Sequence, residues 1–467
     1  MQNKDSLNKI YKVNEVLLHL SIFFSIMQLI CPFYEKTNIR PDYICLIGVL
    51  ITFIFVIRRS NIKLFFKSII DVLLSYKFLT IMCCAYFVWD TINFLYSKDP
   101  IFVIDKYLIW GKISLLCICI IYYINPVGVN IKINYKINML LANLGLTSII
   151  VSLIANVGYY TDTFTEYENV ITTISDYNVF SSGIMFGFVC LCYLLIFCKN
   201  MGIHKRIVLI GINVIICLPV MYLSGSRRTI ILLFIFVIWF IIYILFSILK
   251  EDKNIKKICK NIFLICIVVI ISFLLCLAQI KLFDLYSSNK TDSPGVSEKV
   301  ETIIEGSGLD LRLMIWKSSI QWYNEMEPVN KLIGGGGSYH SDVFNDLNAS
   351  QNKDLVEHYN IKEGTIRWMR PHNFLLEDLL IGGIIKIMIT LGIIVLISAK
   401  IIRGIIKGQT KYNILIVTLY AVLLGNLMMG GYWGLFGNRY TWIIITLHYL
   451  IMFYYKVEND KMERING

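Results

Sequence analysis

The chain has 467 residues, of which 57% are hydrophobic and only 16% are charged. A soluble domain carries about 25% charged residues, so this composition excludes a soluble protein and predicts an all-α integral membrane protein. The formal net charge of +12 fits inner-face loops rich in Lys and Arg, and no basic stretch is organised enough to predict nucleic acid as a partner. All 13 cysteines lie at or before Cys276, and no Cys/His cluster has metal-ligand spacing, so no metal site is predicted.

About twelve apolar runs are long enough to cross a bilayer as helices. They lie near residues 16–34, 42–58, 78–97, 102–124, 138–157, 178–198, 206–223, 229–249, 261–280, 374–399, 412–430 and 440–455. The first run follows three lysines and lacks a small-x-small cleavage pattern, so we expect a retained signal anchor. Residues 61–75 have an apolar side interrupted by Lys63, Lys67 and Asp71, which predicts a helix lying in the inner interface.

The distribution of Lys and Arg predicts the orientation of the chain. Counting from an inside N-terminus, the basic residues fall in the even-numbered loops. The odd-numbered loops are poor in Lys and Arg, and one of them, residues 158–177, carries acidic residues and no basic one. This bias places both termini in the cytoplasm and the polar stretch 281–371 outside. The expected division is a membrane domain of about nine spans at 1–280, an extracytoplasmic catalytic loop at 281–372 and a second membrane domain of about three spans at 373–467.

Three arginines lie at the predicted outer ends of spans, against this bias. Arg227 and Arg228 follow the sequence Ser224-Gly225-Ser226, and Arg439 precedes the last span. Such arginines can extend to lipid headgroups, or they can form a fixed cationic site for an anionic ligand. Two adjacent arginines after small residues favour the ligand site.

The outer loop contains two recognisable segments. Residues 311–323 form a predicted amphipathic helix, in which Leu313, Trp316 and Ile320 are expected to pack on the loop's own core and Arg312 lies beside that stripe. Four consecutive glycines follow at 334–337. Their amides could approach a phosphate, although a plain loop is an equally good interpretation.

The loop ends at Arg367-Trp368-Met369-Arg370-Pro371-His372-Asn373. Proline suits a first helical turn, so a span is expected to begin here, with Asn373 near its cap. A lone histidine is usually structural, but Arg367, Arg370 and Glu377 lie near His372 in the sequence. Histidine can accept a proton from an attacking hydroxyl, and arginine pairs bidentately with a diphosphate.

Taken together, these motifs resemble those of the O-antigen polymerase and ligase superfamily over about residues 215–400. The resemblance rests on Ser226-Arg227 at a helix start, Arg312…Trp316, a Gly-Gly turn, and His372-Asn373-x-x-Leu376-Glu377…Gly382-Gly383-Ile384-Ile385. The chain departs from the family pattern at Arg228, where a small residue is expected, and in its longer glycine run.

The resemblance implies a fold, an activity and roles for the site residues. It implies a multispan GT-C-type glycosyltransferase that needs no metal or other cofactor and acts at the outer face of the bacterial cytoplasmic membrane. Its donor and acceptor would be polyprenyl-diphosphate-linked oligosaccharides. By resemblance, Arg227 and Arg312 would engage the donor diphosphate and His372 would activate the acceptor. The residues expected to bind substrate are Arg228, Arg367, Arg370, Asn373, Glu377, Arg439 and Trp316.

Three functions remain open. The favoured one is a polymerase that transfers the glycan to the next lipid-linked repeat unit of an O-antigen or capsule, with a flippase and a chain-length regulator as further expected partners. A ligase would pass the glycan to lipid A core or another acceptor. A flippase or other transporter is a different class, for which Asp90, near the outer end of its span, is the one deep acidic candidate.

Overall fold

The computed structural model describes most of the chain. It describes residues 2–30, 41–59, 62–95, 100–126, 132–161, 171–172, 177–197, 202–226, 228–233, 307–337, 349–359, 370–407, 410–430 and 434–466, with Tyr339 and parts of 236–285. These residues form helices joined by turns, and no strand occurs among them. The predicted all-α fold is confirmed for this part of the chain.

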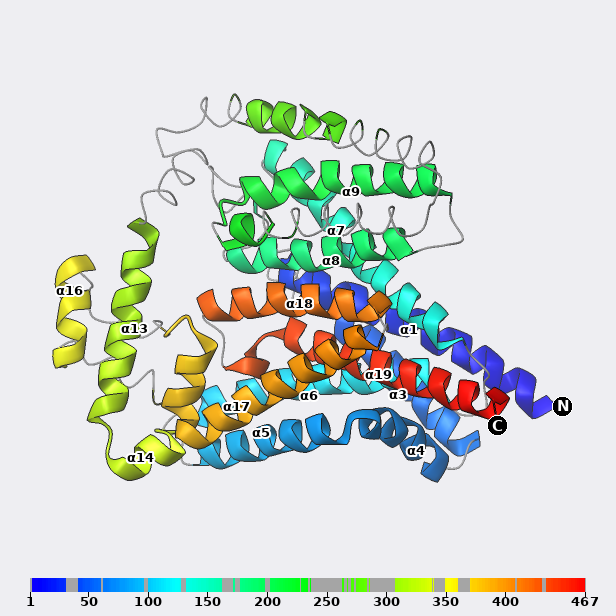
Figure 1. The fold of residues 1–467 in the computed structure, drawn as a ribbon, viewed down its shortest axis with the longest axis horizontal. Coiled ribbons are helices and arrows are strands. Elements are labelled where there is room, and N and C mark those ends of the chain that lie inside the picture. The colour runs from blue at the N-terminus through cyan, green and yellow to red at the C-terminus, as the bar shows by residue number, and fades with distance from the viewer. Residues whose placement is uncertain are drawn as a thin grey trace. The chain divides into compact units, whose positions relative to one another are not determined.

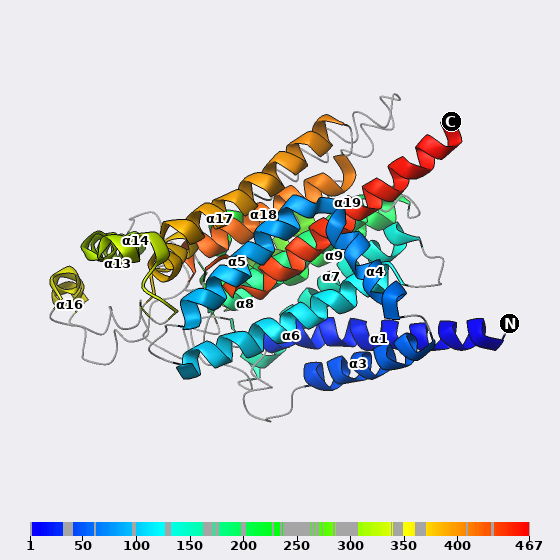
Figure 2. The same cartoon turned by 90° about the horizontal axis from the view of Figure 1, so that it is seen from below.

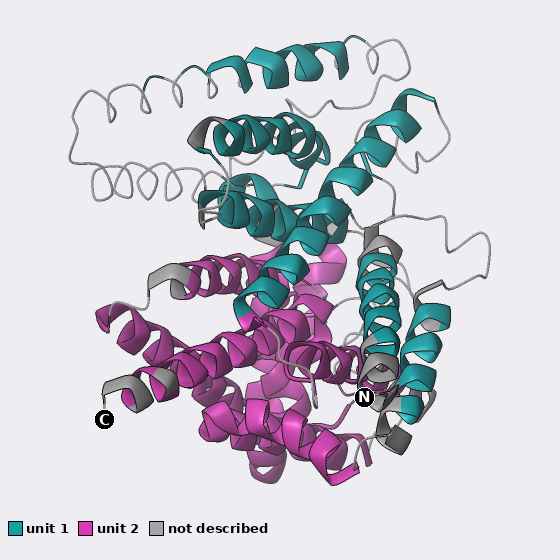
Figure 3. Ribbon diagram, turned by 90° about the vertical axis from the view of Figure 1, so that its right-hand side faces the viewer, with its two compact units in different colours: residues 1–56, 134–305 teal, residues 57–133, 306–467 magenta. Residues whose placement is uncertain are grey.

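The chain folds as two compact units (Figure 3). Unit 1 comprises residues 1–56 and 134–305, and unit 2 comprises residues 57–133 and 306–467. The helices of unit 1 are α1 (Gln2–Ile30), α3 (Pro41–Arg59, whose last residues belong to unit 2), α7 (Ile133–Tyr160), α8 (Tyr177–Phe197) and α9 (Ile203–Leu223). Within unit 1, α8 packs along α9 and also contacts α1.

Unit 2 contains the helices between residues 57 and 133 and those after residue 306. Its elements are α4 (Ile62–Leu73), η1 (Leu74–Tyr76), α5 (Lys77–Leu95), α6 (Pro100–Ile124), α13 (Ser307–Glu325), α14 (Pro328–Ile333), η2 (Ser350–Asn352), α16 (Lys353–Tyr359), α17 (Phe374–Ile406), α18 (Thr410–Met429), η4 (Leu435–Gly437) and α19 (Arg439–Asn466). α5 lies alongside α17 in both Figure 1 and Figure 2. The loop helices α13, α14 and α16 gather at the end of unit 2 where α17 begins.

Among the described residues, five helical segments are long and apolar enough to cross a membrane, by length and composition. They are Ile62–Leu95, Ile133–Tyr160, Tyr177–Ile196, Lys205–Leu223 and Phe374–Ile406. Other helices, such as α3, α6, α18 and α19, coincide with further predicted spans. The chain is therefore an α-helical membrane protein. The number of about twelve spans stays a prediction, because most of 229–249 and part of 261–280 lie outside the described residues.

The amphipathic helix predicted at 61–75 is present as α4. Its buried residues are Phe65, Ser68, Ile69 and Val72, while Lys63 and Lys67 are exposed. These apolar positions repeat at intervals of three and four, as expected for one face of a helix. The turn η1 then leads directly into α5.

Candidate functional site at the start of α17

Helix α17 begins where the sequence predicted the tenth span to begin. Asn373 is the N-cap, and its Oδ1 atom accepts hydrogen bonds from the amides of Leu375 (2.9 Å) and Leu376 (3.4 Å). These bonds satisfy N–H groups that the start of a helix leaves without intrahelical partners. The cap therefore fixes where the helix starts, and with it the position of His372.

His372 has a left-handed backbone conformation. Its φ is 51°, and among the described residues it is the one non-glycine residue with positive φ. A conformation of this kind costs on the order of 1–3 kcal/mol and persists where the surrounding structure enforces it, which is common at active sites. The His372 side chain is partly exposed. It is thus both held by the backbone and accessible.

Two charged residues accompany His372 at this helix start. Glu377 lies in the first turn of α17 and is 1% exposed, where the helix dipole favours a carboxylate. Burial lowers the pKa of Arg370, and the Glu377 carboxylate opposes this effect. An electrostatic coupling of this kind requires the two groups to be close. Arg370 and Glu377 therefore influence each other across the helix start that His372 precedes, whereas Arg367 lies outside the described residues.

The amphipathic helix predicted at 311–323 exists as part of α13, but the predicted buried stripe is wrong. Leu313 and Ile320 are 48% and 49% exposed, and Trp316 is only partly buried. Where burial is described, the buried residues of α13 are instead Ile315, Ser318, Ser319 and Trp322, and Met326, just after the helix, is buried as well. The reason is that α13 packs on α17, η2 and α16, so its neighbours select a different face from the one that hydropathy alone indicated.

Two predicted site residues lie on the first half of α13. The Arg312 Nη1 atom lies 3.5 Å from the Met429 Sδ atom at the end of α18. The Trp316 Nε1 atom is buried and makes no hydrogen bond within the described part of the chain. A buried N–H without a partner is costly, so the Trp316 indole is available as a hydrogen-bond donor to a ligand.

The arginines at the other predicted helix starts have different surroundings. In unit 1, the Ser226 Oγ atom accepts from the Thr229 amide (3.4 Å) and donates to Asn178 Oδ1 (2.9 Å), so the predicted helix start at Ser226 is confirmed. Arg228 is 7% exposed, and Arg227 lies outside the described residues. In unit 2, α19 begins at the predicted position Arg439.

The glycine run at 334–337 does not present its amides to a ligand. The amides of Gly335 and Gly336 donate to the carbonyls of Leu380 (2.8 Å) and Ile381 (3.1 Å), and that of Gly337 donates to Asn93 O (3.2 Å). Each N–H is occupied by a backbone carbonyl, so the phosphate-binding interpretation is excluded for these three glycines.

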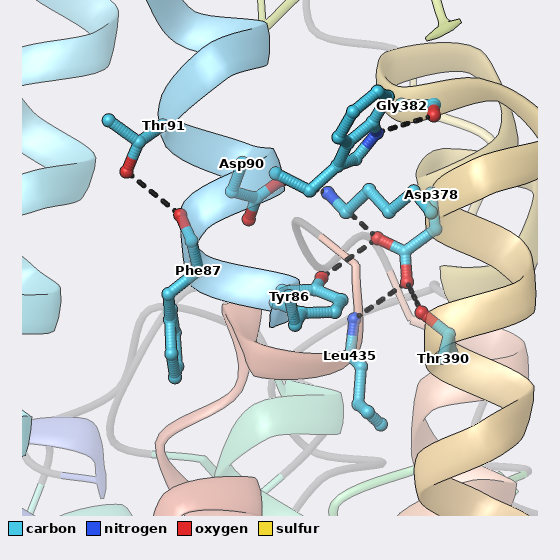
Figure 4. A network of polar contacts seen from close by, with 10 residues as sticks. Tyr86, Phe87, Asp90, Thr91, Asp378, Gly382, Thr390 and Leu435 are labelled. Atoms are coloured by element: carbon cyan, nitrogen blue, oxygen red, sulfur yellow. Dashed lines mark hydrogen bonds and ion pairs between the residues drawn. The ribbon is translucent and has the colours of Figure 1, made fainter. Parts of the chain in front are cut away.

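A buried cluster of charges next to this site went unpredicted (Figure 4). Lys386 of α17 forms ion pairs with Asp90 of α5 and with Asp378 of α17, the latter at 3.0 Å, and all three side chains are fully buried. The Asp378 carboxylate also accepts from Tyr86 Oη (2.9 Å) and Thr390 Oγ1 (2.8 Å). The missed signal was a lysine inside an apolar run, since a charge within a span is costly and needs a partner.

These observations define a class of protein: an α-helical membrane protein in which a histidine with a constrained backbone precedes the capped start of a long apolar helix. Among the described residues, no group of His, Cys, Asp and Glu is arranged to hold a metal ion.

Residues 212–397 match the family model described as O-antigen ligase. This segment contains α13, α14 and most of α17, and the match supports the O-antigen polymerase and ligase superfamily. No curated protein matches the chain.

Proposed function

We propose that the protein is a polysaccharide polymerase of the bacterial cytoplasmic membrane. It transfers a polyprenyl-diphosphate-linked glycan to a hydroxyl of the next lipid-linked repeat unit at the outer face. The observation that carries the proposal is His372, held in a left-handed conformation at the capped start of α17 within the segment that matches the O-antigen ligase family.

The chemistry follows from the residues at this helix start. An acceptor hydroxyl attacks the anomeric carbon of the donor, the bond from that carbon to the diphosphate oxygen breaks, and polyprenyl diphosphate leaves. A neutral His372 accepts the hydroxyl proton as the new glycosidic bond forms. Arg312, together with Arg227, stabilises the charge that develops on the departing diphosphate, because guanidinium groups pair bidentately with phosphate oxygens. No metal ion is required for these steps.

The remaining polar residues would bind the saccharide and the diphosphate. Arg370 and Glu377, which influence each other electrostatically, would contact the substrate next to His372, and the Trp316 N–H, buried without a hydrogen bond in the described part of the chain, would donate to a hydroxyl. Arg228 and Arg439 lie at helix starts, where a cation can meet an anionic ligand at the membrane surface. Asn373 contributes through its cap, which holds His372 in place.

The test uses purified protein in liposomes supplied with lipid-linked repeat units. His372→Asn and His372→Gly both remove the imidazole, but they keep a residue that tolerates positive φ. We expect each variant to lose about 10²–10⁴-fold in the rate of chain extension, while Arg403→Ala, an exposed change at the far end of α17, leaves the rate unchanged. Wild-type rates in both His372 variants would sink the role of the histidine.

A ligase is the second candidate, because the description of the matching family names one. The same liposomes decide between the two functions when the donor is offered with either a lipid-linked repeat unit or a lipid A core acceptor. A polymerase extends the first acceptor and leaves the second unchanged. Transfer to the core acceptor alone would identify the ligase.

A further inference from the structure

Helix α17 is broken near its start. Gly383 has φ 66° and ψ −164°, which are not helical. In an unbroken helix, the carbonyls of Leu380, Ile381 and Gly382 would each accept from the amide four residues ahead. The part after the break, 384–406, alone exceeds the roughly 20 residues that a membrane span needs. The break therefore separates a span from a short outer segment, 374–382, which follows His372.

Donors from two other parts of unit 2 replace the lost helical bonds. Gly335 and Gly336, in the glycine run, donate to the carbonyls of Leu380 and Ile381, and Trp89 Nε1 of α5 donates to the Gly382 carbonyl (2.9 Å). Buried carbonyls without donors would be costly, so the break depends on the glycine run and on α5.

This contact requires glycine on both sides. A Cβ atom added to Gly334, which has φ 90°, would overlap the backbone of Ile381, and one added to Gly383 would overlap the Leu332 carbonyl. Overlap with backbone cannot be relieved by rotating a side chain. The run of glycines is thus explained by the close approach of two backbones.

The C-terminal end of helix α13 packs against α17 just before the break. Trp322 and Met326 pack with Leu380 in one buried cluster, and the Tyr323 hydroxyl donates to the Lys331 carbonyl of α14 (3.0 Å). α14 itself packs against α17. The orientation of α13, and so of Arg312 on it, is set where it meets the break.

The buried charges connect the two sides of the break. Asp378 precedes it, whereas Lys386 and Thr390 follow it, and both of these side chains contact the Asp378 carboxylate. The second carboxylate on Lys386, that of Asp90, belongs to α5. Figure 4 shows Asp90 and Asp378 on their two helices, with Tyr86 and Leu435 beside Asp378. These contacts hold the outer segment, the span and α5 in one arrangement.

We propose that Asp90, Asp378, Lys386 and the glycine run form a joint whose members are positioning residues for the transfer reaction. The joint fixes the outer segment 374–382, and the His372 that precedes it, relative to α13 and its Arg312. The joint does not touch substrate; it acts through these two residues. Its catalytic consequence rests on the proposed function, which assigns their roles.

The first test changes the joint without changing its charges. Gly334→Ala drives the two backbones apart, whereas in the control Gly392→Ala, on α17 beyond the break, the added Cβ atom would meet only the flexible end of Met82. The assay is chain extension in nanodiscs, with rates normalised to folded protein. We expect Gly334→Ala to lower kcat on the order of 10²-fold, the cost of a small misplacement of catalytic groups, with KM for the donor within about twofold. Equal normalised kcat in the two variants would overturn the proposal.

The second test does not depend on any glycan transfer. The triple variant Asp90→Asn, Asp378→Asn, Lys386→Met removes every charge of the cluster together, so no buried charge is left without its partner. Hydrogen–deuterium exchange of wild type, this variant and Gly334→Ala is compared peptide by peptide. Faster exchange in 374–382 and in α13, with α8 of unit 1 unchanged, supports the joint. Unchanged exchange in these two segments in both variants would show that it does not hold them, whatever the activity.

The two tests also separate this inference from the proposed function. A wild-type protein that extends no lipid-linked glycan would remove the polymerase and with it the roles of His372 and Arg312. The exchange pattern would then decide alone whether the joint fixes segment 374–382 against α13.

Discussion

The two units of the protein hold their helices together by different means. In unit 1, buried contacts are mostly uncharged: Asn213 Nδ2 donates to Phe188 O (3.3 Å) and Cys192 Sγ (3.3 Å), and the ion pair Lys136–Glu15 includes a carboxylate side chain that is 23% exposed. Unit 2 instead contains three charged side chains with no exposure at all.

This difference in buried contacts indicates a different structural requirement in each unit. Uncharged hydrogen bonds and close packing are enough to assemble helices in a membrane. Fully buried charges add a desolvation cost that packing does not require, and they are retained where a site needs a fixed geometry. The charges lie at the break in α17, a few turns from His372. Unit 2 therefore contains both the strained backbone of His372 and the buried charges. The transporter hypothesis relied on Asp90 as a deep acid, and Asp90 is now accounted for by its pairing with Lys386.

The largest loss in the free energy of unfolding is expected when the buried carboxylates of unit 2 lose their cationic partner. Lys386→Met leaves the carboxylates of Asp90 and Asp378 without their cation, which should lower the free energy of unfolding by about 3–5 kcal/mol. Denaturant unfolding in detergent micelles measures it. The matched change in unit 1, Lys136→Met, should cost less because Glu15 reaches solvent. Equal losses of unfolding free energy in the two variants would show that the units do not differ in this respect.

The next effect tests whether unit 1 depends on close packing. A Cβ atom on Gly187 of α8 would overlap Ser148 Oγ and the Leu144 carbonyl of α7, so Gly187→Ala should destabilise by about 1–3 kcal/mol. The control is Gly111→Ala in α6 of unit 2, where nothing lies within 4 Å and alanine should stabilise the helix by about 0.5–1 kcal/mol. The same unfolding measurement applies. A neutral Gly187→Ala would show that α7 and α8 are not tightly packed.

A smaller effect is expected at the cap of α17. Asn373→Ala removes the acceptor for the Leu375 and Leu376 amides and should cost about 1 kcal/mol. Asn373→Asp keeps an acceptor and should be near neutral. Amide exchange at the first turn of α17 reports the loss directly, and slow exchange in the alanine variant would mean that the cap does not hold the helix start.

The smallest effect separates burial from charge. Lys317 and Asp354 form an ion pair at 3.0 Å between α13 and α16, but their side chains are 71% and 61% exposed. Lys317→Ala should change the free energy of unfolding by about 0–1 kcal/mol, with less effect as salt is added. A loss as large as that of Lys386→Met would mean that charge alone, and not its burial, distinguishes unit 2.

Local signals in the sequence predicted the helix starts well. The pattern Pro371-His372-Asn373 placed the start of α17, and Ser226 and Arg439 marked two further helix starts. These predictions hold because a cap depends on residues within one turn of each other. The helix at 61–75 was predicted for the same reason, since its apolar period is a local property.

Predictions that depended on neighbours were less accurate. Leu313 and Ile320 form an apolar stripe on α13, but Leu380 of α17 packs instead against Trp322 of α13 and Met326 just after it. The glycine run suited a phosphate loop or a plain turn, and its amides instead donate to backbone carbonyls of two distant helices: Leu380 and Ile381 of α17, and Asn93 of α5. Hydropathy and spacing do not specify which surface a helix meets.

By itself, the sequence determined that this is an α-helical membrane protein, where many of its helices begin, and which histidine and arginines are candidates for glycan transfer. The first two follow from composition and from residues close together in the chain, and the third follows from the resemblance of short motifs to the O-antigen polymerase and ligase superfamily. Only the tertiary structure decided that Lys386 lies between Asp90 and Asp378, and that the glycine run supports the broken α17. Ion pairs and backbone contacts between distant segments depend on which helices pack together, and that choice is made by the whole fold.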